Sequence, residues 1–124
     1  MNRRFRLKRA SDFQRVRREG RSFAHPLVVL VVAPNTEGRV RVGVAAGRTI
    51  GKAVARNRAK RRLREVIRPL LPLLPPGWDL LLIARHPLNQ APFADLRQAV
   101  YLLLRRAGLL PPPAAPSPRR ENLS

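Results

Sequence analysis

The chain of 124 residues contains no cysteine, which excludes disulfide bonds, thiolate metal sites and cysteine nucleophiles. It also lacks the run of about 18 apolar residues that a membrane-spanning helix would need. The basic N-terminus is not followed by the apolar stretch of a signal peptide. We therefore expect a cytoplasmic protein that does not span a membrane.

Acidic residues are scarce, with seven Asp and Glu against 26 Lys and Arg. The seven carboxylates are scattered along the chain, without the close pair that two catalytic metal ions would require. The two histidines, His25 and His86, each precede a proline, a setting more typical of a turn than of a general acid or base. Serine-nucleophile motifs and phosphate-binding glycine loops are absent as well. The sequence therefore predicts that any chemistry lies with a partner.

Positive charge is what the chain has in excess, with a net charge of +19 and a pI of about 12.0. This balance favours a nucleic acid as partner, with an anionic membrane surface as the second possibility. The length suits one domain with a single core. We expect a basic N-terminal arm at residues 1–10, an RNA-binding domain at 11–109 and a disordered, proline-rich tail at 110–124.

The most basic segment runs from residue 49 to 68 and holds eight of the 26 basic residues. Only Glu65 can pair with these cations at helical spacing, so the like charges repel one another. Such a face can simply be solvated, but the unbalanced charge favours contact with a polyanion. Apolar residues recur at i, i+4, i+7, i+8 and i+11, which predicts a helix with one buried face. That face is predicted to comprise Ala59, Leu63, Val66, Ile67 and Leu70.

Segments rich in β-branched residues predict strands at 27–33 and 39–46, which a short turn would join as an antiparallel hairpin. A shorter strand is possible at 22–24, and an apolar strand at 78–84 should be covered on both faces. Gly43 marks either a bulge in its strand or a place where another group approaches closely.

Two further helices are predicted on either side of these strands. The first covers residues 12–19, with Ser11 beginning a capping box and Gly20 in the left-handed conformation that ends a helix. The second covers residues 92–106. The order α-β-β-β-α-β-α predicts an α+β fold, a two-layer sandwich in which helices pack on a four-stranded mixed sheet. The buried face of the last helix is predicted to comprise Phe93, Leu96, Val100, Leu103, Leu104 and Ala107.

The basic helix carries a spaced motif, Arg56-Asn57-Arg58-x-Lys60-Arg61-x-x-Arg64, preceded by Ile50-Gly51. This motif resembles the RNR motif of the bacterial ribonuclease P protein subunit, and the likeness extends from about residue 7 to residue 109. The resemblance implies a fold similar to the second domain of a small-subunit ribosomal protein. It also implies a left-handed crossover, whereas the general rule for parallel neighbours predicts a right-handed one.

The resemblance implies a cytoplasmic ribonucleoprotein for maturation of the tRNA 5′ end, in which the RNA subunit and its Mg²⁺ hydrolyse precursor tRNA. We expect one protein for each RNA and a monomer when the protein is free. By the resemblance, the RNA subunit should contact Arg56, Asn57, Arg58, Lys60, Arg61, Arg62, Arg64 and Arg68. The cleft for the 5′ leader should comprise Phe13, Arg15, Arg17, Val31 and Arg48.

The chain departs from the family pattern within this expected cleft. Phe13 is either a core residue or a ring on which a base stacks. Arg17 replaces an aromatic residue that is frequent in the family, and Val31 is aliphatic where an aromatic residue is common. These changes weaken base stacking and strengthen contacts to phosphate.

Three functions from different classes stay open at this point. The residues and their order favour a subunit of a ribonucleoprotein enzyme. Composition alone would suit an RNA-binding protein without enzymatic function, such as a ribosomal protein. A nuclease that acts without an RNA subunit is the third possibility, and the scattered carboxylates argue against it.

Overall fold

The computed structural model describes residues 5–111, so residues 1–4 of the predicted arm and 112–124 of the predicted tail lie outside the described residues. The helices and strands follow the order that the sequence predicts, which confirms the α+β class. In chain order they are α1 (Ala10–Glu19), β1 (Arg21–Ala24), β2 (Val28–Pro34), β3 (Arg41–Ala46), α2 (Ala53–Ile67), β4 (Trp78–Ala84) and α3 (Phe93–Arg106).

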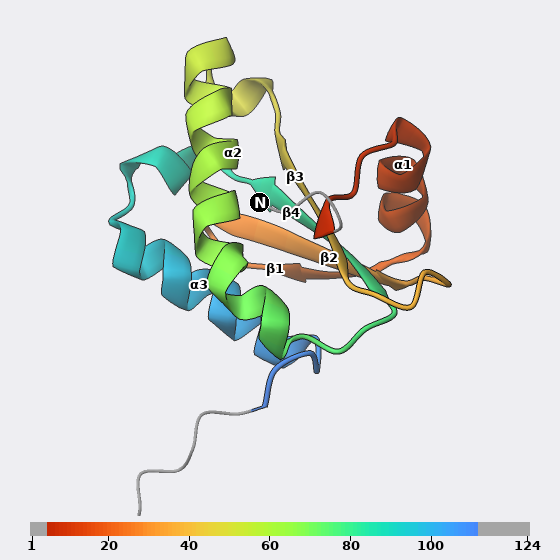
Figure 1. The fold of residues 1–124 in the computed structure, drawn as a ribbon. Coiled ribbons are helices and arrows are strands. Elements are labelled where there is room, and N and C mark those ends of the chain that lie inside the picture. Colours follow the sequence, from red (N-terminus) through yellow and green to blue (C-terminus); the bar gives the residue numbers. More distant parts are fainter. Residues whose placement is uncertain (1–4, 112–124) are drawn as a thin grey trace, which may run out of the picture.

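Within the described residues the strands form one mixed sheet in the order β1-β2-β4-β3 (Figure 1). β2 pairs antiparallel with both β1 and β4, whereas β3 runs parallel to β4. The predicted hairpin of residues 27–33 and 39–46 is therefore wrong, because β4 lies between β2 and β3. Apart from Asp79, β4 is apolar on both faces, and such a strand gains most from a central position that is covered on both sides.

Helices cover the two faces of the sheet unequally (Figure 1). α2 and α3 lie on one face and form the predicted two-layer sandwich with it, burying even-numbered strand residues such as Leu30 and Leu82. α1 lies on the opposite face, over a smaller cluster that includes Val16 and Leu81. Most of the core therefore lies between the sheet and the pair α2 and α3.

α2 stays helical despite its crowded charges because its apolar face is buried. A fully buried Leu or Ile contributes about 1.5–3 kcal/mol, whereas a like-charged pair at helical spacing costs roughly 0.2–0.5 kcal/mol. A few buried side chains therefore offset the repulsion along the exposed face. The spacing prediction is confirmed for the four members of that face within the helix, which are Ala59, Leu63, Val66 and Ile67.

The buried face of α3 begins one turn later than predicted. Phe93, the first residue of the helix, is 41% exposed, so its assignment to the core is wrong. Leu96 is the first fully buried residue, and Ala99, which the periodicity argument omitted, is buried as well. Phe93 continues the apolar stripe along the helix axis, and at this end the stripe extends beyond the core.

The packed domain begins before the predicted boundary at residue 11. Leu7 is buried, and its N–H donates to the carbonyl oxygen of Val42 at 2.8 Å. Arg6 forms an isolated parallel bridge with the same strand residue. At the other end Leu109 and Leu110 are also buried. Residues 5–9 are thus part of the fold and lie beside the free edge of β3.

The start and end of α1 differ from the predicted capping pattern. The helix begins at Ala10 with Arg9 as its N-cap, so Ser11 lies inside it and makes no capping hydrogen bond. Gly20 is extended, with φ of −82°, and does not adopt the predicted left-handed conformation. A Cβ atom at Gly20 would lie 2.5 Å from the carbonyl oxygen of Val16 and 2.7 Å from Cγ1 of Val31. Glycine is therefore needed here for the close approach of α1 to β2.

Candidate nucleic-acid interface

The cations of α2 are directed away from its buried face, as a phosphate-binding ridge requires. None of the predicted RNA-subunit residues is buried. The exposed members are Asn57, Arg58, Arg61 and Arg68. The partly exposed members are Arg56, Lys60, Arg62 and Arg64.

The side chain of Arg62 is bonded to another segment of the protein. Its guanidinium donates at 2.6 Å to the carbonyl oxygen of Leu88 and at 2.6 Å to that of Ala91. Both acceptors lie at the turn η4 (His86–Gln90), and Asn89 of the same turn donates to the carbonyl oxygen of Ala55. Burial, together with the charge of Arg58, lowers the pKa of Arg62. Both terminal nitrogens therefore have protein partners that tie α2 to the loop after β4, so Arg62 has a structural role that the predicted RNA contact did not include.

A hollow of about 430 Å³ brings α1, α2 and the N-terminal segment together. Four cations and an aromatic ring line it, with no acidic side chain among the lining residues. We call it the Phe13 hollow. Its lining comprises Arg6, Leu7, Lys8, Phe13, Val44, Lys60 and Arg64.

The cations of the Phe13 hollow repel one another in the free protein. Burial, reinforced by the nearby charge of Arg6, lowers the pKa of Arg64. The Nε atom of Arg64 is buried and has no hydrogen-bond partner within the described residues. An anion brought from outside would relieve the repulsion, and phosphate oxygens match the donor geometry of guanidinium.

Phe13 is half-buried and lines this hollow while its ring also packs on the sheet. A Cβ atom at Gly43 would lie 2.5 Å from Cε1 of Phe13. The pairing of β3 with β4 continues through Gly43 without a bulge, so this glycine serves the close approach of the ring. The two interpretations of Phe13, core residue and ring beside a ligand, therefore both apply.

Val31 is covered by α1 and is only 3% exposed, so its assignment to an open cleft is corrected. The same face of the sheet continues uncovered one row further on, where Val29, Ile83 and Ala45 pair across β2, β4 and β3. All three are partly exposed. Strand alternation places Val29 and Val31 on one face, but only the position of α1 decides which of them is partly exposed.

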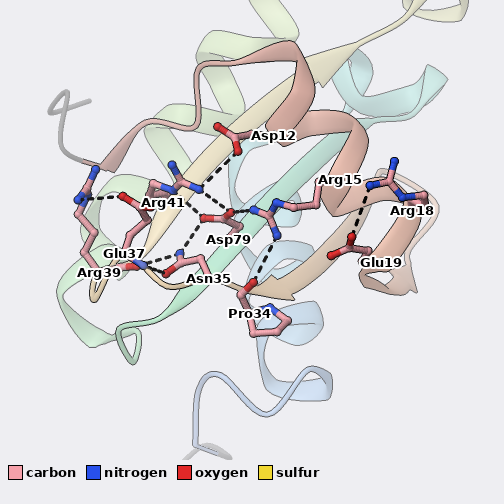
Figure 2. A network of polar contacts seen from close by, with 10 residues as sticks. All are labelled: Asp12, Arg15, Arg18, Glu19, Pro34, Asn35, Glu37, Arg39, Arg41 and Asp79. Atoms are coloured by element: carbon pink, nitrogen blue, oxygen red, sulfur yellow. Dashed lines mark hydrogen bonds and ion pairs between the residues drawn. The ribbon is translucent and has the colours of Figure 1, made fainter.

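Arg15 does not point into the expected cleft. Its guanidinium forms an ion pair with Asp79 and donates to the carbonyl oxygen of Pro34 at 3.3 Å. Figure 2 shows the Asp79 carboxylate between Arg15 of α1 and Arg41 of β3. The assignment of Arg15 to the leader cleft is corrected, since its charge is used to hold α1 on the sheet.

Asp79 is completely buried, yet it is ionised because donors surround it. Arg41 donates to both of its carboxylate oxygens at 2.8 Å, and Asn35 donates to one of them at 2.7 Å. Burial by itself would raise the pKa of Asp79, but the hydrogen bonds from Arg41, Asn35 and Arg15 outweigh burial and lower it. The same ion pair raises the pKa of Arg41.

Arg17 and Arg48 are exposed, and neither lines the Phe13 hollow. His25 and His86 line a separate hollow of about 660 Å³ beyond the end of β4. The N–H of Leu27 donates to Nδ1 of His25 at 3.1 Å, the turn geometry that the following proline suggests.

Within residues 5–111 no three His, Asp or Glu side chains gather to hold a metal ion. No helix in that part of the chain is long and apolar enough to cross a membrane.

A sequence model of the family described as Ribonuclease P matches residues 1–108. The chain belongs to the ribonuclease P protein family. The predicted resemblance is thereby confirmed, and this member of the family is a component of an endoribonuclease complex.

Relatives of the ribonuclease P protein family are similar over most of the chain. The protein component from Chloroflexus aurantiacus is 46% identical over 114 residues, which cover 91% of this chain and 84% of the relative. That from Symbiobacterium thermophilum is 49% identical over 111 residues, which cover 89% of this chain and 96% of the relative.

Two solved structures of the family share the fold. The ribonuclease P protein of Staphylococcus aureus has a TM-score of 0.77 at 28% identity, covering 86% of this chain and 97% of the other. That of Thermotoga maritima has a TM-score of 0.72 at 30% identity, with 82% and 96% covered.

Sequence reasoning missed Arg6 and Lys8, which line the Phe13 hollow, and Val29, which lies on the partly exposed strip of the sheet. The sequence did contain a signal for the position of Arg6 and Lys8. Leu7 is an isolated apolar residue between these basic neighbours and could have indicated that the segment is anchored. The sequence contained no signal for the pairing of that segment with β3, since an isolated bridge leaves no repeating pattern in the sequence.

Replacing Asp79 by Asn should destabilise the fold in a pH-dependent way. The lowered pKa means that the ionised carboxylate stabilises the fold above about pH 3.9, the unfolded value, and that this contribution is lost as pH falls through the folded value. At pH 7 we expect a loss of up to about 3 kcal/mol, because the partly buried Arg41 and Arg15 lose the carboxylate that they share. Urea unfolding at pH 7 and pH 3 measures this loss of stability. Asp95→Asn, at an exposed position, serves as the control. An equal loss at both pH values would contradict the ionised role.

Arg62→Ala should lower the free energy of unfolding by about 1–3 kcal/mol, because two carbonyl acceptors lose their donor. Arg61, the exposed neighbour of Arg62, offers a control with the same change of charge. Arg61→Ala should change the free energy of unfolding by no more than about 0.5 kcal/mol. Urea unfolding of both variants without RNA compares them. Equal stabilities would show that the two hydrogen bonds to the η4 turn contribute nothing.

Proposed function

We propose that the chain is the protein subunit of the ribonuclease P ribonucleoprotein, in which it binds the catalytic RNA and the 5′ leader of precursor tRNA. The observation that carries this proposal is the Phe13 hollow, whose lining combines four cations and a half-buried aromatic ring and includes no acidic side chain. Cations suit phosphate groups, and the ring suits an unstacked base. Family membership supports the same assignment.

In this proposal the RNA subunit makes and breaks the bonds, and the Mg²⁺ of the reaction is held mainly by RNA. The described residues do not form a site that fits Mg²⁺, so no step of the protein's action is derived through the ion. The protein acts by charge. Catalytic RNA and precursor tRNA repel each other where their phosphates meet, and a basic protein at that place lowers the repulsion.

The RNA subunit is proposed to contact the outer side of α2. Arg58 and Arg61 are exposed and line neither the Phe13 hollow nor the core, so their guanidinium groups are available to phosphates. Arg68 is exposed as well, although it pairs with Glu65. Arg56 and Asn57 complete this surface on the first turns of the helix.

The leader is proposed to run along the uncovered strip of Val29, Ile83 and Ala45 and then to reach Phe13. The strip is apolar and partly exposed, which suits the faces of bases. Lys60 and Arg64 of α2 belong to this leader contact, since they share the hollow with Phe13. The sequence analysis assigned Lys60 and Arg64 to the RNA-subunit contact, and the proposal assigns them to the leader instead.

The proposal includes a cytoplasmic location, one protein for each RNA and a monomeric free protein. These points follow from the function that is proposed. An RNA-binding protein without a processing role is the alternative that the composition also suits. Reconstitution with the RNA subunit separates the two.

Reconstitution tests the proposed function. The chain is mixed with a bacterial ribonuclease P RNA and precursor tRNA at low Mg²⁺, and release of the 5′ leader is measured. We expect the protein to stimulate cleavage, because it lowers repulsion that Mg²⁺ otherwise has to screen. Binding without stimulation would support the alternative, and cleavage without the RNA would show that the protein itself is a nuclease.

Two variants should separate the two contact surfaces in that assay. Arg61→Ala should weaken assembly with the RNA subunit, whereas Phe13→Ala should weaken binding of leader-bearing substrate and leave tRNA without a leader unaffected. Base stacking contributes about 1–3 kcal/mol, so the Phe13 effect should be roughly fivefold or more.

The salt dependence of assembly provides the matching control for this pair. Each phosphate contact adds about −0.7 to −0.9 to the slope of log K against log salt, so Arg61→Ala should reduce the slope by one contact. Phe13→Ala carries no charge change and should leave the slope unaltered. A slope for the parent protein shallower than about −2 would rule out the multiple phosphate contacts proposed for α2.

A further inference from the structure

The N-terminal segment, residues 5–9, is a fixed part of the structure and not a free basic arm. The bridge of Arg6 to Val42 and the buried side chain of Leu7 hold it beside β3. In Figure 1 this segment lies between α1 and α2. The side chains of Arg6 and Lys8, on either side of the Leu7 anchor, are therefore presented from a defined backbone.

A second hollow of about 330 Å³ lies next to the Phe13 hollow. Arg6 and Lys8 line both, so the two hollows adjoin each other on either side of the N-terminal segment's cations. We call it the Arg9 hollow. Its lining comprises Arg6, Lys8, Arg9, Asp12, Glu37, Arg39 and Arg41.

The acidic side chains of the Arg9 hollow are already directed at particular cations. Asp12 lies 3.7 Å from Arg41, and Glu37 lies 3.6 Å from Arg39. Arg41 in addition pairs with the buried Asp79.

The three cations of the N-terminal segment, in contrast, have no acidic partner among the described residues. Within the described residues Arg6, Lys8 and Arg9 have no ion pair, and Arg9 is the N-cap of α1, at the positive end of the helix dipole. The hollow is therefore electropositive through residues that the protein itself does not neutralise.

We infer that the Arg9 hollow binds phosphodiester groups of the single-stranded leader after it leaves the Phe13 hollow. This inference rests on the proposed function, because it extends the leader's path over the N-terminal segment. The leader is favoured over the RNA subunit because the hollow adjoins the one that holds Phe13 and shares Arg6 and Lys8 with it, whereas the exposed cations Arg58 and Arg61 of α2 line neither hollow.

Two substitutions of opposite sign test the inference in the reconstituted holoenzyme. Arg9→Ala removes a cation that lines only this hollow, and Glu37→Gln removes an exposed acid from it. Arg9→Ala should weaken binding of leader-bearing precursor tRNA roughly twofold to fivefold, and Glu37→Gln should strengthen it by a similar factor, the range of a single exposed charge pair. A role in folding alone would not produce a gain in affinity.

The controls carry the same charge changes on α3, which lies across the sheet from α1. Arg106→Ala matches Arg9→Ala, and Asp95→Asn matches Glu37→Gln; both positions are exposed. Affinities are measured for a series of precursor tRNAs with leaders of increasing length and for tRNA without a leader. The effects at Arg9 and Glu37 should appear only above a certain leader length. The salt slope of Arg9→Ala should be shallower by about 0.7 for each leader phosphate that the variant no longer neutralises.

The inference is overturned if Arg9→Ala and Glu37→Gln match their controls at every leader length. It is also overturned if they change binding of the RNA subunit alone, because the phosphates would then belong to that RNA. A failure of the proposed function would look different, since the unmodified holoenzyme would then show no preference for leader-bearing substrate and Phe13→Ala would have no effect.

Discussion

The burial of one face of α2 against the sheet is the interaction on which the rest of the molecule depends. Leu63 and Ile67 are fully buried there, and the energy of their burial holds a row of cations in fixed directions against mutual repulsion. A disordered chain of the same composition would attract RNA, but it would incur an entropic cost for every side chain that it ordered on binding. The helix has its cations in place beforehand.

The second requirement is the position of α1, and a buried carboxylate provides it. Asp79 is the only charged residue that is fully buried within the described part of the chain. It faces Arg41 of the adjacent strand and Arg15 of α1, so a single acid in a very basic protein joins the helix to the sheet. Phe13 lies on the same helix two residues before Arg15, and the position of its ring above Gly43 depends on that connection.

Residues with the same chemistry have different roles in this structure because their surroundings differ. Arg61 and Arg62 are neighbours on α2, yet Arg61 is exposed while Arg62 is bonded to two carbonyl oxygens of another segment. Helical spacing predicted the face of Leu63 correctly, because periodicity follows from backbone geometry alone. It could not predict the partners of Arg62 or Arg15, which lie 19 or more positions away in the sequence.

The sequence by itself determined the element order, the buried stripe of α2, the excess of positive charge and the family motif, since each is written in local spacing or composition. The tertiary structure alone decided that β4 separates β2 from β3, that α1 covers Val31 and leaves Val29 partly exposed, and that Arg6 and Lys8 meet Lys60 and Arg64 around one hollow. These features depend on which distant segments pack together. That choice is made by the total burial of apolar surface and by the pairing of Asp79, and no short stretch of sequence contains either.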